Sequence, residues 1–295
     1  MPDNLLDNLD VFYGELTPAR ATVYARLEGL ENATGLSLSG FVRGPRCFYS
    51  TTLLSTYPLS DAGPGPSLVA KALVPDPCYW SPETPNIYDV TVELRRGQDI
   101  IASEVRQIGF KPLGISGRFF TWEGKPWVMR GIKQVNSTIE TDIFAWRDQG
   151  AVLVGVPSSD ELRLASEKGI LVYCMLAADA DRLKSELRRV SYHPAVFAFG
   201  TCYPDRGSGL KGVAPNVLLF FYGIVDQEYP LPHWASFGHI AAGEPQETAE
   251  VALQTAEPIV LSKFHAKSSL SEARAAADKL QADLAPYGQF AGYIV

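Results

Sequence analysis

Histidine, cysteine and methionine are scarce in this sequence of 295 residues, which contains four, four and three of them. The cysteines are widely spaced and form no C-x-x-C pair, so their spacing predicts neither a disulfide scaffold nor a metal site. We expect Cys174 and Cys202 to be buried as small apolar side chains. The sequence predicts no cofactor and no bound metal.

Long apolar runs and basic runs are also missing. No segment approaches 18 apolar residues, which predicts no transmembrane helix and no membrane partner. The formal net charge is −7 and no basic run exceeds two residues, which argues against a nucleic-acid partner. The first ten residues contain three aspartates and no basic residue, unlike a secretory signal. We therefore expect a cytoplasmic protein, although removal of a signal peptide would leave the same sequence.

The composition is that of a folded chain. Hydrophobic residues make up 46% and charged residues 20% of the sequence, which is enough apolar material for a core. A length of 295 residues fits two domains. The 25 glycines and 21 prolines, which follow no regular period, indicate many turns between short elements.

Residues 1–116 have the pattern of short strands. Apolar and polar side chains alternate over 21–27, 36–42 and 88–94. Turn-forming residues separate these runs, and no long helical pattern interrupts them. This half of the sequence predicts an immunoglobulin-like β-sandwich.

Residues 117–295 change to an alternation of strand-like and helix-like runs, which predicts a parallel sheet and favours a barrel. The expected strands are 127–132, 151–156, 170–176, 195–200, 217–225, 234–240, 258–264 and 290–295. The expected helices are 139–149, 160–168, 179–190, 247–256 and 271–284. Eight strand–helix units usually need roughly 200 residues or more. We therefore expect a compact (β/α)8 TIM-like barrel with helices missing between Gly207 and Gly243.

Five stretches contain recognisable motifs, of which the first three are specific in combination. They are Trp-Ser-Pro-Glu-Thr-Pro-Asn-Ile-Tyr at 80–88, Ile-Gly-Phe-Lys at 108–111, the segment 119–132, His-Pro-Ala-Val-Phe-Ala-Phe at 193–199 and Glu-Pro-Ile-Val-Leu-Ser at 257–262. Together they resemble glycoside hydrolase family 2, which contains β-galactosidases, β-glucuronidases and β-mannosidases. The resemblance implies a sandwich followed by a barrel, with 193–199 as the fourth and 257–262 as the seventh barrel strand. The family's amino-terminal jelly-roll domain has no counterpart in this sequence.

The resemblance also implies a retaining mechanism with two glutamates. One, at the end of the fourth strand, protonates the leaving oxygen, and the other, at the end of the seventh, attacks the anomeric carbon. Such carboxylates must lie about 5 Å apart across the sugar. In this sequence Tyr203 and Pro204 align with the family's Asn-Glu pair, Asp205 comes one residue later, and Lys263 stands at the nucleophile position. A lysine cannot form the glycosyl ester.

The two strands before these positions depart from the family in the same way. The ends of the second and third strands, 152–156 and 173–177, are neutral where the resemblance implies charged residues. Four altered strand ends favour a degenerate member that lacks both catalytic glutamates. The leading hypothesis is a pseudo-glycosidase that acts as a carbohydrate-binding or assembly module.

Two alternatives stay open. The protein could be an active O-glycosyl hydrolase with displaced carboxylates, such as Asp205 with Glu228 or Asp226. It could also be a purely structural subunit of an oligomer. Carbohydrate and protein partners are both compatible with the sequence.

The ligand-binding candidates are Lys263, Tyr203, Asp205, Trp234, His265 and His239. Lys263 could form an imine if burial lowered its pKa, but we favour a lysine that fills the former pocket and pairs with Asp205. Trp234 lies at an expected loop-to-strand boundary, where its ring could stack on a sugar. Histidines beside strand ends serve more often as framework than as ligands.

Overall fold

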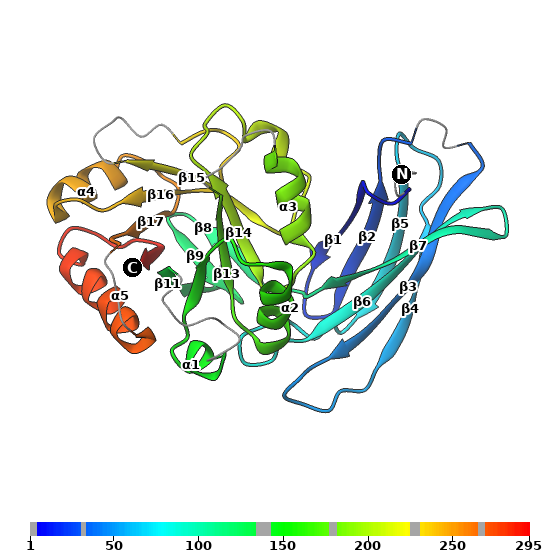
Figure 1. The fold of residues 1–295 in the computed structure, drawn as a ribbon, viewed down its shortest axis with the longest axis horizontal. Helices are drawn as coiled ribbons and strands as arrows, with labels where there is room; N and C mark the ends of the chain where they lie inside the picture. Colours follow the sequence, from blue (N-terminus) through cyan, green and yellow to red (C-terminus); the bar gives the residue numbers. More distant parts are fainter. Residues whose placement is uncertain (1–4, 31–33, 134–142, 177–181, 225–230, 265–268) are drawn as a thin grey trace.

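The computed structural model describes residues 5–30, 34–133, 143–176, 182–224, 231–264 and 269–295. Figure 1 shows two bodies side by side, an antiparallel β-structure and a barrel of parallel strands. None of the described helices is long and apolar enough to cross a membrane. The predicted fold class, a β-sandwich followed by a (β/α)8-like barrel, is confirmed.

The first body contains seven antiparallel strands in the order β1-β2-β5-β4-β3-β6-β7. Their bounds are β1 Leu9–Leu16, β2 Arg20–Leu27, β3 Leu36–Arg46, β4 Ser55–Asp61, β5 Leu68–Pro75, β6 Ile87–Arg96 and β7 Asp99–Ile108. Buried and partly exposed side chains alternate along β2 and β6, because successive side chains of a strand point to opposite faces. The buried side chains of the two layers pack together in one hydrophobic core.

Strand β4 joins the two layers of the sandwich. Its first part pairs with β3, with Leu59 beside Gly40. Its last two residues pair with β5, with Ser60 beside Lys71 and Asp61 beside Ala70. The antiparallel sheet is therefore continuous and curls over its own core.

A small three-stranded sheet connects the sandwich to the barrel. It consists of β8 Leu113–Ser116, β9 Phe119–Trp122 and β10 Lys125–Trp127. The Phe120 ring lies 4.9 Å from that of Phe237, and the Trp127 ring lies 5.7 Å from that of Phe197. The sheet therefore covers the amino-terminal end of the barrel. The predicted domain boundary after residue 116 falls between β8 and β9 and stays a prediction.

The barrel is closed, and all eight expected strands form it. They are β11 Met129–Lys133, β12 Val152–Gly155, β13 Val172–Leu176, β14 Val196–Thr201, β15 Leu218–Ile224, β16 Phe237–Ala241, β17 Ile259–Ser262 and β18 Gly292–Ile294. As expected, the motif at 193–199 overlaps the fourth strand, β14, and the motif at 257–262 contains the seventh, β17.

Five α-helices occur in the described part of the barrel: α1 Ile143–Asp148, α2 Ser159–Lys168, α3 Leu183–Ser191, α4 Pro245–Ala252 and α5 Leu270–Leu284. Between β14 and β15 there is only the 3₁₀ helix η2, Ser208–Leu210. Residues 231–236, the described part of the connection from β15 to β16, contain no helix. The expectation of missing helices between Gly207 and Gly243 thus holds for the described residues.

Aromatic rings fill the centre of the barrel. Tyr173 stacks on Phe220 with ring centroids 4.2 Å apart, and Phe220 lies 5.4 Å from Phe237. A Cβ atom on Gly200 would lie 2.3 Å from the Phe220 ring. Glycine is therefore needed at this inward position because the ring occupies the space of a side chain.

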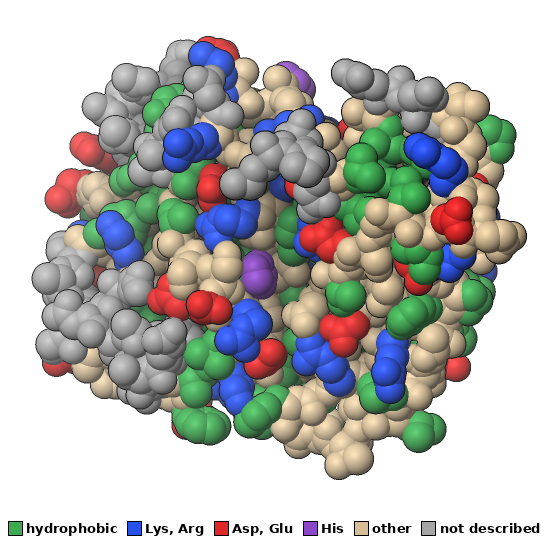
Figure 2. All heavy atoms as spheres, turned by 45° about the vertical axis from the view of Figure 1, so that its right-hand side comes forward, with side chains coloured by type: hydrophobic (Ala, Val, Ile, Leu, Met, Phe, Trp, Pro, Cys, Tyr) green, Lys and Arg blue, Asp and Glu red, His purple; other side chains and the backbone are tan. Residues whose placement is uncertain are grey.

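The sandwich packs on the barrel through buried polar contacts. Asp10, which is 3% exposed, accepts hydrogen bonds from Arg26 and Arg188, both at 3.1 Å. The Trp80 indole donates to the Ser166 carbonyl at 2.9 Å. Acidic and basic side chains are interspersed on the face shown in Figure 2. The described side chains on that face therefore do not form the one-sided charge pattern that binds polyanions.

Candidate functional site

The register of the barrel determines which side chains at the end of β17 point inward. His239 lies among the central rings, 4.8 Å from Tyr222 and 5.6 Å from Tyr173, and it pairs with Val260. Neighbouring residues of parallel strands share a face, and successive residues alternate. Ser262, two residues after Val260, therefore faces the barrel interior, and Lys263 faces outward.

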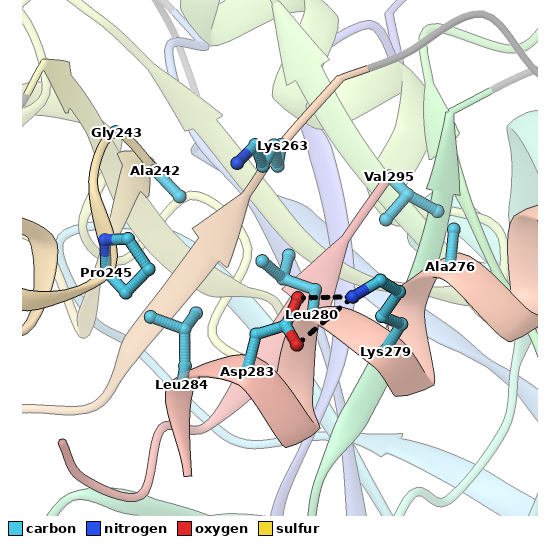
Figure 3. Close-up of a pocket in the computed structure, with 10 residues that line it drawn as sticks. All are labelled: Ala242, Gly243, Pro245, Lys263, Ala276, Lys279, Leu280, Asp283, Leu284 and Val295. Carbon is cyan, nitrogen blue, oxygen red and sulfur yellow. Dashed lines mark hydrogen bonds and ion pairs between the residues drawn. The ribbon is translucent and has the colours of Figure 1, made fainter. Parts of the chain in front are cut away.

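The outward direction of Lys263 corrects the expectation that this lysine fills the former pocket. Its side chain lines a cavity outside the barrel wall, together with Ala276, Leu280 and Leu284 of α5. Figure 3 shows Lys263 and Val295 at this cavity with α5 in front of them. Among the described residues, no ion pair joins Lys263 to Asp205. Lys263 is exposed, so imine formation lacks the burial that it would require.

Ser262 occupies the inward position instead. The side chain is 1% exposed, and its Oγ finds no hydrogen-bond partner among the described residues. Strand β11, which follows β18 around the barrel, contributes a second cation at the carboxyl ends of the strands. Its last residue, Lys133, has its ammonium 4.8 Å from the centre of the Phe264 ring. In the described part of the chain, the ends of β17 and β11 therefore bring a hydroxyl and two ammonium groups, and no carboxylate.

The end of β14 contains the other predicted site residues. Thr201 is buried, and its hydroxyl accepts the Tyr203 backbone N–H at 3.3 Å. Tyr203 is half-buried against the barrel core. Asp205 is exposed on the following loop. The structure thus places Tyr203 and Asp205 on one loop but does not bring either to Lys263.

Trp234 packs under this loop. It is 2% exposed, and its indole donates to the Pro204 carbonyl at 2.7 Å. A Cβ atom on Gly207 would lie 2.0 Å from the Trp234 ring, so the ring covers the loop backbone. Ligand contact by Trp234 stays a prediction, and its described surroundings give the ring a packing role.

His239 belongs to the barrel core. It is fully buried, and burial lowers its pKa to about 3, so the imidazole is neutral at physiological pH. This placement agrees with the framework interpretation rather than with ligand binding. His265, Asp226 and Glu228 lie outside the described residues.

The cysteine prediction was half right. Cys174 is buried, and burial raises its pKa to about 12. Cys202, in contrast, is exposed, because the chain leaves β14 at Thr201 and the next residue already belongs to the loop. Among the described residues, no group of three or more His, Cys, Asp or Glu side chains is placed to hold a metal ion.

Sequence reasoning missed the cavity beside Lys263. Its walls consist of residues that directly follow β16, β17 and β18, the first residue of α4 and one side of α5. The signal that could have located it is the strand period. Once residues 260 and 262 are known to face the barrel interior, the alternation of side chains along the strand places residue 263 on the side that faces the helices.

Comparisons with known proteins point to one family. A model of the glycosyl hydrolases family 2 matches residues 51–111. A β-galactosidase of Leuconostoc mesenteroides is 28% identical over 133 residues, which are 44% of this chain and 13% of that enzyme.

Solved structures extend the similarity along the chain. Bacteroides uniformis β-glucuronidase 2 matches 97% of this chain with 45% of its own, at a TM-score of 0.65 and 15% identity. The β-glucuronidase of Parabacteroides merdae matches 97% with 46% of its own, at a TM-score of 0.66 and 12% identity. This chain spans less than half the length of these proteins. The sequence match over residues 51–111 makes this chain family 2-like, and the solved structures show that its sandwich and barrel share the fold of these glycosidases.

Proposed function

We propose that this family 2-like chain does not hydrolyse glycosides and serves as a binding or assembly module. The observation that carries the proposal is the chemistry at the ends of β14 and β17. Tyr203 and Pro204 stand where the resemblance implies the acid/base, and Ser262 and Lys263 stand at the end of the nucleophile strand. A retaining glycosidase needs opposed carboxylates about 5 Å apart.

The orientation of Lys263 strengthens this interpretation. Because the Lys263 side chain faces away from the barrel interior, it places neither a nucleophile nor a cation inside the carboxyl-terminal end of the barrel. The inward hydroxyl of Ser262 is buried at a wall whose neighbours, Ala241 and Ile294, are apolar. No described residue accepts a hydrogen bond from this hydroxyl, and a hydroxyl that no base activates cannot replace the carboxylate in glycosyl transfer.

An edge of the sandwich favours assembly over carbohydrate binding. Strand β7 ends the sheet order, so its outer backbone groups have no strand partner in the described structure. The side chains of Ile100 and Val105 on this strand are 51% and 55% exposed. A long edge strand with exposed apolar residues is a template for pairing with another chain.

The test of hydrolysis uses four chromogenic substrates: the p-nitrophenyl β-galactoside, β-glucuronide, β-glucoside and β-mannoside. We expect no p-nitrophenol release above the buffer blank. Robust turnover that is abolished by Asp205→Asn, Asp226→Asn or Glu228→Gln, but not by Asp160→Asn at the start of α2, would contradict the proposal. That outcome would establish displaced carboxylates.

The test of assembly is a molar-mass measurement by light scattering over a range of protein concentrations. We expect a self-associated fraction that Val105→Lys reduces, because a charge on an edge strand opposes pairing. Val156→Lys, at an equally apolar and exposed position beyond β12, is the control and should leave the mass unchanged. A monomer at all concentrations, together with saturable binding on a glycan array, would favour a carbohydrate-binding module instead.

A further inference from the structure

A cavity of about 230 Å³ lies between the outer wall of the barrel and helix α5. We call it the lateral pocket. Its strand-side residues are Ala242, Lys263 and Val295, and α5 forms the facing wall. Figure 1 shows α4 and α5 on the side of the barrel opposite to the sandwich. The pocket is therefore separate from the barrel interior, where the resemblance implies a glycosidase site.

The walls of the lateral pocket are mainly apolar. Six apolar side chains line it: Ala242, Pro245, Ala276, Leu280, Leu284 and Val295. An engineered apolar cavity of about 150 Å³ is large enough for a benzene ring. A volume of 230 Å³ therefore accommodates one aromatic ring, or a short aliphatic chain, together with a small polar group.

The charged side chains at the pocket determine which polar group a ligand would carry. Lys279 and Asp283, four residues apart on α5, form an ion pair with distances of 3.0 and 3.2 Å, which Figure 3 shows as dashed lines. Lys263 has no ion-pair partner among the described residues. Because Lys279 and Asp283 neutralise each other, the Lys263 ammonium is the one charge beside the apolar walls that no described residue neutralises.

We propose that the lateral pocket binds a small carboxylate with an apolar body, with the carboxylate against Lys263 and the body against Leu280 and Leu284. Charge complementarity selects the carboxylate, and burial of apolar surface supplies the remaining affinity. Lys263 and Lys279 are exposed at the rim, so a ligand can enter without opening the barrel. The proposal is independent of whether the protein hydrolyses glycosides.

Phenylacetate is a suitable probe because it joins one aromatic ring to one carboxylate. Binding is followed by NMR of ¹³C-labelled methyl groups, which reports both affinity and location. We expect saturable shifts in Leu280, Leu284 and Val295 as phenylacetate is raised to about 10 mM, a range suited to small ligands of low affinity. The neutral phenylacetamide and the cationic 2-phenylethylamine should bind at least about threefold more weakly.

Three variants separate the contribution of the Lys263 charge from that of the apolar cavity. Lys263→Met should weaken phenylacetate binding by about three- to tenfold and remove the preference over phenylacetamide. Ala276→Leu should fill the cavity and abolish binding, while leucine remains a good helix former. Lys184→Met, on the exposed side of α3, is the matched control and should bind like the unmodified protein.

Several results would overturn the proposal. They are the absence of saturable shifts at the highest phenylacetate concentration, shifts centred outside the lateral pocket, equal affinity for phenylacetate and phenylacetamide, and unchanged binding in Lys263→Met. Because Lys263 is exposed at the rim, its replacement should leave the fold intact. The methyl spectrum of each variant without ligand verifies this point.

Discussion

Lys111 is a cation enclosed at the junction of the two bodies. Its side chain is 6% exposed, and its ammonium donates to the Pro194 carbonyl at 2.7 Å. The hydroxyl of Tyr13 accepts the Lys111 backbone N–H at 3.2 Å. No carboxylate pairs with the ammonium within the described chain. Burial therefore lowers the pKa of Lys111 to about 7.

This burial makes stability depend on pH. The unfolded chain holds the Lys111 proton up to its ordinary pKa of 10.5, whereas the folded protein releases it above about 7. Between these values the unfolded state binds more protons, so the contribution of Lys111 to stability rises with pH. We expect the free energy of unfolding to increase by about 2 kcal/mol from about pH 7 to about pH 9 relative to Lys111→Met.

Urea unfolding followed by circular dichroism at the two pH values measures this difference. Lys184→Met removes an exposed lysine and should keep the pH dependence of the unmodified protein. Equal pH dependence in the unmodified protein and in Lys111→Met would show that the ammonium stays protonated in the fold.

Single residues also show which features of the site the sequence alone could predict. The lysine at position 263 and the tyrosine–proline pair at 203–204 are visible as departures from the family pattern, whereas the resemblance itself came from the intact motifs around them and agrees with the family-model match. The direction of Lys263 could not be predicted, because it depends on the register of β17 with β16 and β18. That register exists only once the ring of strands has closed.

At the scale of elements, apolar runs bounded by turns located all eight barrel strands, since a buried parallel strand is apolar on both faces. The dual pairing of β4 was not predictable. It depends on two residues, Ser60 and Asp61, which leave β3 and join β5, and no local pattern encodes a change of partner. Helix α2 was predicted at 160–168, within one residue of its observed start, because its end signals are local.

Those end signals give a prediction for α2. The Ser158 hydroxyl accepts the Glu161 backbone N–H at 3.2 Å, and the Glu161 carboxylate accepts the Ser158 backbone N–H at 2.8 Å. This capping box satisfies two amide groups that the helix itself leaves unpaired. We expect Ser158→Ala to lower the free energy of unfolding by about 1 kcal/mol, measured by urea denaturation. Ser60→Ala, at an exposed strand position, should change it by less than about 0.5 kcal/mol; equal losses would refute the capping role.

At the scale of the whole molecule, a charge cluster fixes the sandwich on the barrel. Asp10 of β1 contacts Arg188 of α3, and Arg188 also donates to the Asn8 side chain at 2.7 Å. Arg26 reaches the Gly212 carbonyl at 2.7 Å. These partners are separated by most of the chain, so composition and periodicity could not reveal that they meet.

Removal of Asp10 should therefore destabilise the whole protein. Asp10→Ala leaves two arginines partly buried without their carboxylate, and we expect a loss of about 3 kcal/mol in the free energy of unfolding. Glu15→Ala breaks the exposed pair with Arg20 and should cost less than about 1 kcal/mol. Thermal unfolding of both variants distinguishes them. A similar, small shift in each would mean that the cluster adds little to stability.

The barrel closes where β18 pairs with β11, with Met129 beside Gly292 and Gly131 beside Ile294. The Val295 amide donates to the Gly131 carbonyl at 3.1 Å. During synthesis on the ribosome, the sandwich strands emerge long before β18, and one edge of β11 stays without its partner until β18 has been translated. Nascent chains therefore pass through a stage with a finished sandwich and an unclosed set of parallel strands, and at that stage molecular chaperones have most to protect.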